Sequence, residues 1–123
     1  MLVISQEQMA VFSRVALDAF EERMQEMVEL RYPRKARDLT EPELRAIVHS
    51  GVQRARRYGI DLTRDVEQFI RIMFRFRVFE FEKDPPTAWT RDIFTDDTLT
   101  ADEKLGQVEG RASLFGLIER DED

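Results

Sequence analysis

"MFRFRVFEFE", residues 73–82, places four of the chain's nine phenylalanines in ten positions. Phenylalanine and valine alternate there with Arg75 and Arg77, and this period of two residues favours a β-strand. The rest of the sequence has no second strand pattern with which the stretch could pair. Because an isolated strand leaves its backbone hydrogen-bonding groups unsatisfied, we do not expect a strand here.

Interpreted as a helix, the same stretch has a broad apolar face. At 3.6 residues per turn, Phe74, Val78 and Phe81 share that face, whereas Phe79 lies opposite. We therefore predict that a helix ends near Phe79, with Phe74 and Val78 in the core. Phe79 or Phe81 would then fold back on the core or meet a partner, and joint exposure of these two rings would mark a protein-docking site.

Helix starts elsewhere in the chain share one signal, a hydroxyl residue followed three positions later by Glu or Gln. In such a capping box the hydroxyl accepts from a free backbone N–H, and the longer side chain reaches back to the cap. The pairs are Ser5 with Gln8, Thr40 with Glu43, and Thr100 with Glu103. Apolar residues at helical spacing follow each pair, which predicts three amphipathic helices.

Proline and glycine mark the expected helix ends. The first helix, about 25 residues long at the observed spacing, should stop before Pro33, which biases Tyr32 toward an extended backbone. Gly59 suits a left-handed cap at the end of the second helix. Either Asp61 or Thr63 would then cap the third helix.

The later helices each have one apolar stripe. The positions predicted to face inward are Leu44, Ile47, Val48, Gly51, Val52, Ala55, Val66, Phe69, Ile70, Met73, Phe74, Leu105, Val108, Ala112, Phe115 and Ile118. A short helix or turn is expected after the break at Asp84-Pro85-Pro86. Together these patterns predict an all-α fold, a compact bundle of four to five helices with a long N-terminal helix. The expected domain spans residues 1–118, followed by an acidic tail at residues 119–123.

Length and charge limit the class of protein. A chain of 123 residues with 42% hydrophobic content is typical of one folded domain. Residues 1–30 carry a net charge of −4, residues 31–77 carry +6 and residues 78–123 carry −8. This segregation can orient a partner, although charge runs are usually solvated helix faces. The absence of cysteine, of a signal peptide and of a membrane-length apolar run favours the cytoplasm and no membrane contact.

No catalytic constellation is visible in the sequence. The single histidine, His49, has only Ser50 as a neighbouring nucleophile, and that side chain projects about 100° away around the helix. Neither a nucleophile motif, nor a metal-ligand pattern, nor a phosphate-binding glycine loop is present. We therefore interpret His49 as structural and expect neither enzymatic activity nor a cofactor.

Arginines gather around the end of the second helix and in the third. They are Arg54, Arg56, Arg57, Arg64, Arg71, Arg75 and Arg77. Cations near a helix C-terminus complement its dipole, which accounts for the first three without a ligand. A sequence pI of about 4.9 opposes contact with phosphate backbones, so no nucleic-acid partner is expected. The acidic last third could instead mimic nucleic acid and block a basic toxin.

The segment GVQRARRYGIDLTRDVEQFIRIMF at residues 51–74, the turn DPPTAW and its DIF resemble an uncharacterised family of small bacterial proteins. That family has a similar length and an "ISQEQM"-like start, and its members are encoded beside spike and toxin genes of type VI secretion systems. The resemblance implies an accessory protein that binds a toxin or spike component as adaptor or chaperone, or a cytoplasmic immunity protein. The aromatic content of residues 73–82 departs from the family pattern.

Partner binding is therefore the favoured function, with another protein such as a toxin, a spike component or a neighbouring gene product as the partner. The long acidic first helix and an aromatic edge suit helix-in-groove docking. The candidate binding residues are Phe79, Phe81, Arg75, Arg77 and Trp89. A structural homodimer that buries the first-helix stripe or the Phe79 edge is the remaining alternative.

Overall fold

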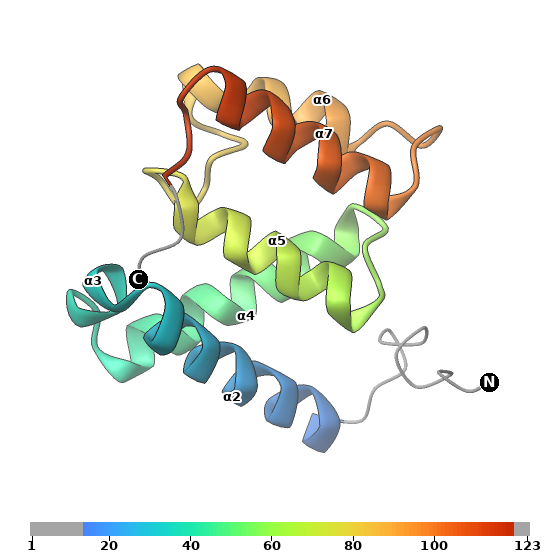
Figure 1. Cartoon of the computed structure of the whole chain (residues 1–123). Coiled ribbons are helices and arrows are strands. Elements are labelled where there is room, and N and C mark those ends of the chain that lie inside the picture. The colour runs from blue at the N-terminus through green and yellow to red at the C-terminus, as the bar shows by residue number, and fades with distance from the viewer. Residues whose placement is uncertain (1–13, 120–123) are drawn as a thin grey trace.

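Six α-helices and one 3-10 helix make up residues 14–119, the part of the chain that this computed structural model describes (Figure 1). They are α2 (Arg14–Arg31), α3 (Pro33–Arg37), α4 (Glu41–Arg57), α5 (Thr63–Arg75), the 3-10 helix η2 (Pro85–Thr87), α6 (Trp89–Phe94) and α7 (Ala101–Leu114). Within the described residues there is no strand, only one antiparallel bridge between Phe76 and Ile118. The predicted all-α bundle is confirmed.

Helix α5 lies at the centre of the bundle (Figure 1). It contacts α2 and α4 on one side and α7 on the other, and α6 packs on α7. The buried residues of α5 are Asp65, Val66, Phe69, Ile70, Ile72, Met73 and Phe74. All five positions predicted to face inward from this helix are among them. The apolar face of α5 is broad because the helix has packing partners on two sides.

Aromatic rings fill the space between α5, α6 and the turn that follows α5. The ring centroid of Phe69 lies 5.3 Å from that of Phe94 and 5.9 Å from that of Phe81. Tyr58, at the end of α4, stacks on Phe94 at 5.1 Å. Burying one such ring stabilises the fold by about 1.5–3 kcal/mol. This cluster therefore holds α6 and the turn against α5.

The capping boxes predicted for α4 and α7 are both present. The backbone N–H of Glu43 donates to Thr40 Oγ1 at 3.2 Å, and the Glu43 carboxylate accepts from Thr40 N at 2.8 Å. Thr100 and Glu103 make the same pair of bonds at 3.1 and 2.8 Å. The third predicted box, Ser5 with Gln8, lies outside the described residues, and the long first helix is described only from Arg14 onward as α2.

Glycines end α4 and α7 in the same way. Gly59 has φ +79°, as predicted for a left-handed cap, and Gly116 has φ +67°. After α7 the N–H of Leu117 donates to the carbonyl of Ala112 at 2.8 Å, which closes a Schellman motif. The prediction that Phe115 faces the core is wrong, because the helix stops at Leu114 and leaves the Phe115 side chain 63% exposed.

Helix α5 ends at Arg75 and not near Phe79 as predicted. Phe76 already has an extended backbone, with ψ 158°. Lys35, from α3, donates to the carbonyl of Phe76 at 3.0 Å and also to that of Phe74. A lysine from another helix thus satisfies carbonyls at the end of α5, so the helix gains little by continuing.

Two boundaries involve residues that the sequence assigned differently. Leu62 occupies the N-cap of α5 and makes no side-chain cap bond, so the expected cap by Asp61 or Thr63 is wrong. Asp65 in the first turn supplies negative charge there instead. Pro33 does follow the end of α2, but it also begins the short helix α3, because proline fits the first turn of a helix.

Candidate docking groove

An apolar groove lies where the end of α5, η2 and the turn after α7 meet. We call it the end groove, and its volume is about 280 Å3. Its lining residues are Phe76, Arg77, Val78, Asp84, Pro86, Thr87, Gly116 and Leu117. Arg77 and Asp84 are the charged members of this lining. A groove of this size and chemistry suits an apolar anchor side chain from another protein.

Hydrogen bonds to backbone carbonyls fix the two walls of the end groove. On one wall, the N–H of Glu119 donates to the carbonyl of Arg75 at 2.9 Å, beside the bridge between Phe76 and Ile118. On the other wall, Thr87 Oγ1 donates to the carbonyl of Phe81 at 2.5 Å. The walls are therefore held by bonds to the bundle and do not depend on an occupant.

The floor of the groove continues into the aromatic core. Phe76 is 1% exposed and its ring stacks on Phe81 at 4.4 Å, with 13° between the ring planes. The Phe81 side chain is completely buried. Of the two alternatives that the sequence left open, Phe81 therefore folds back on the core, and its side chain offers no surface to a partner.

Large apolar side chains are exposed at this end of the molecule. Val78 is 42% exposed, and Leu114 and Phe115, which directly precede Gly116 of the groove lining, are 79% and 63% exposed. The prediction that Val78 is a core residue is wrong, because the chain leaves the helix at Arg75 and Val78 then turns to the groove. Adjacent exposed apolar groups are typical of protein-docking surfaces.

A buried ion pair supports the turn beneath the groove. Arg54 Nε donates to Glu82 Oε2 at 2.9 Å, and Arg54 Nη2 donates to the carbonyl of Phe79 at 2.9 Å. The guanidinium also lies over the rings of Phe69 and Phe81, at 5.5 and 5.4 Å. The helix dipole, which the sequence offers as the reason for Arg54, does not account for these contacts. The partner carboxylate lies 28 residues further along the chain, so no local pattern in the sequence reveals this pair.

The surroundings of this pair shift two pKa values. Burial alone would raise the pKa of Glu82, but the hydrogen bonds and positive charge of Arg54 outweigh burial and hold that pKa below its ordinary value. Burial, with the hydrogen bond and negative charge of Glu82, raises the pKa of Tyr58 to about 12. The Tyr58 hydroxyl donates to Glu82 Oε2 at 2.8 Å. Glu82 is therefore held ionised and Tyr58 neutral around pH 7.

The other predicted binding residues have different positions. Phe79 is half-buried against Phe74, with 4.9 Å between ring centroids, so Phe79 and Phe81 are not exposed together. Arg77 lines the end groove and is exposed. Trp89 is half-buried beneath the guanidinium of Arg111, 5.2 Å from the ring. Of the five predicted residues, only Arg77 lines the groove.

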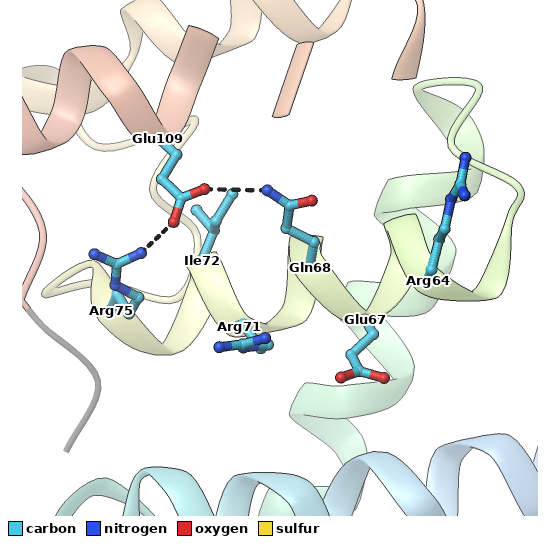
Figure 2. Close-up of a pocket in the computed structure, with 7 residues that line it drawn as sticks. All are labelled: Arg64, Glu67, Gln68, Arg71, Ile72, Arg75 and Glu109. Carbon is cyan, nitrogen blue, oxygen red and sulfur yellow. Dashed lines mark hydrogen bonds and ion pairs between the residues drawn. The ribbon is translucent and has the colours of Figure 1, made fainter. Parts of the chain in front are cut away.

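Arg75 belongs to a second, polar hollow of about 410 Å3 between α5 and α7 (Figure 2). Its side chain is 16% exposed, with Nη1 bonded to Glu109 and Nε to the carbonyl of Glu119 at 2.7 Å. Glu109 also accepts from Gln68 at 3.1 Å. Figure 2 shows Arg64 pointing away from this group, so the cations do not converge on one point. These bonds tie α7 to α5.

His49 pairs with a carboxylate from another helix. Its Nδ1 lies 2.6 Å from Oε2 of Glu21 on α2, and the two side chains are 47% and 4% exposed. Neither residue lines the end groove or the polar hollow. Among residues 14–119, no three acidic or histidine side chains gather in a way that could hold a metal ion.

No helix within the described part of the chain has the length and apolar character to cross a membrane. Comparisons with protein-family models, with curated proteins and with solved structures found no match.

Proposed function

We propose that this chain is a non-catalytic, protein-binding accessory protein whose docking surface is the end groove. One observation carries the proposal: Val78 and Phe115 are large, apolar and exposed, and they lie in or beside an apolar groove with fixed walls. Leaving such groups in water forgoes the free energy of burying them, which a partner can recover. The groove can hold an anchor side chain while the exposed residues cover its surroundings.

The class of partner follows from the family resemblance. We propose that the chain acts as an adaptor or chaperone for a type VI secretion toxin or spike component. The groove lining is mostly apolar and includes the charged residues Arg77 and Asp84, which suits a partner that offers an apolar anchor together with polar groups. A cytoplasmic immunity protein would use the same surface on a toxin.

Co-purification with proteins encoded beside this chain tests the proposal. The tagged chain is expected to retain a neighbouring toxin or spike component, and Val78→Asp should abolish that retention. Leu30→Asp is the matched control, because Leu30 is 81% exposed on α2 and does not line the groove. Equal retention by the two variants, with both folded, would contradict a docking role for the groove.

Expression of the toxin in the cytoplasm, with and without this chain, separates the two partner-binding roles. An adaptor or chaperone should increase the soluble or secreted amount of toxin and leave its toxicity in place. Rescue of growth without a change in toxin solubility would instead support an immunity protein.

A further inference from the structure

We propose that a second copy of this chain covers the end groove when no other protein occupies it, in a dimer with two-fold symmetry. The inference rests on the proposed function, because it takes the groove to be a protein-docking surface. It adds the identity of one occupant, and it is argued from shape and from charge.

A hollow and exposed apolar side chains follow one another along the chain at this surface. Gly116 and Leu117 belong to the groove lining, while the two residues just before them, Leu114 and Phe115, are largely exposed. A two-fold interface brings the same patch of both copies together, so a protrusion and a hollow on one patch can fill each other twice. The side chain of Phe115 from one copy would occupy the groove of the other.

The charges of the lining are self-complementary as well. Arg77 and Asp84 carry opposite charges, and neither side chain forms an ion pair with another described residue. Under two-fold symmetry, Arg77 of one copy faces Asp84 of the other, and the pair occurs twice. A partner patch of a single charge would match only one of these residues and repel the other.

Such a dimer should be weak and reversible. A standard stable interface buries about 800 Å2 per partner, close to a tenth of this molecule's 7462 Å2 of accessible surface. The end groove and its exposed neighbours form only part of such an area. A weak dimer is also what the proposed function requires, because another protein has to displace the second copy.

Sedimentation of the purified chain tests the dimer directly. We expect the average mass to rise from monomer toward dimer between about 1 and 200 µM, because interfaces below the standard size are weak. Arg77→Asp and Asp84→Arg each place like charges across the two-fold axis, and each should weaken the dimer at least about tenfold. Leu30→Asp, outside the groove, should leave the dissociation constant unchanged.

Mixing the two charge variants gives the sharpest result. Each variant alone should remain monomeric, but in the mixture every cross-interface pair joins opposite charges, so the mixture should dimerise as the wild type does. This outcome needs no doubly substituted chain, and it shows that both variants are folded.

A wild type that stays monomeric at 200 µM, or a mixture that sediments like its separate components, would overturn the dimer. Neither outcome decides the proposed function, which is measured by retention of neighbouring gene products. A monomeric chain that still loses its partner on Val78→Asp would keep the proposed function and remove only the second copy.

Discussion

Arg54 on α4 and Glu82 in the turn after α5 form a buried ion pair, with side chains only 6% and 5% exposed. Tyr58 and the carbonyl of Phe79 complete its hydrogen bonding. The pair fixes the turn that contains Phe81, and Phe81 in turn supports the groove floor through Phe76. The ion pair is thus linked to the docking surface through two stacked rings.

Removing one member of this pair should destabilise the fold severely. We expect Arg54→Ala to lower the free energy of unfolding by about 3–5 kcal/mol, because Glu82 would remain buried without its partner. The double change Arg54→Met with Glu82→Leu should cost clearly less, since no unpaired charge is left. Equilibrium urea unfolding measures both, and a single variant as stable as the double one would refute this explanation.

Acid should remove the contribution that ionised Glu82 makes to the free energy of unfolding. Its pKa in the folded chain lies below the ordinary value of 4.5, so its contribution to the free energy of unfolding is complete above pH 4.5 and declines as the pH falls further. Glu82→Gln should therefore flatten the loss of stability below pH 4.5. Burial raises the pKa of Asp65, so Asp65 makes the free energy of unfolding rise as the pH falls, opposite to the effect of Glu82. Because both variants contain Asp65, the difference between wild type and Glu82→Gln isolates the effect of Glu82.

Alkali should lower the free energy of unfolding by ionising Tyr58. Because its folded pKa is raised from 10 to about 12, its contribution is complete below pH 10 and is lost as the pH rises from 10 to 12. Tyr58→Phe should remove this part of the pH dependence in unfolding experiments at constant ionic strength. An unchanged slope between pH 10 and 12 would show that the hydroxyl titrates normally in the folded chain.

Glycine replacements should distinguish a packing position from an open one. A Cβ on Gly51 would lie 2.6 Å from Met73 Sδ and 3.2 Å from Ile70 Cγ1, so we expect Gly51→Ala to cost about 1–3 kcal/mol. A Cβ on Gly106, in α7, would meet no atom within 4 Å apart from its chain neighbours and the nearby backbone of its own helix, and Gly106→Ala should stabilise by about 0.4–1 kcal/mol. Opposite signs in thermal unfolding would confirm the distinction.

The sequence predicted those features that depend on neighbouring residues along the chain. The boxes at Thr40 and Thr100 and the cap at Gly59 form within one helical turn, so local chemistry determines them. The inward face of α5 was also predictable, because apolar residues at helical spacing indicate which face of a helix is buried.

Features that depend on distant contacts were predicted wrongly or missed. Lys35 bonds the carbonyls at the end of α5 and lies 39 residues from Phe74 in the sequence, so no local pattern reveals that bond. The same early helix end moves Val78 from the expected core to the groove. Arg54 pairs with Glu82 across 28 residues, so its burial could not be inferred from the helix alone.

Retention of a neighbouring toxin or spike component by the wild type, Val78→Asp, Phe115→Asp and Leu30→Asp tests the central claim most directly. We predict retention by the wild type and by Leu30→Asp, and loss with the other two while their thermal unfolding stays cooperative. Retention that is unaffected by Val78→Asp and Phe115→Asp would show that the end groove is not the docking surface.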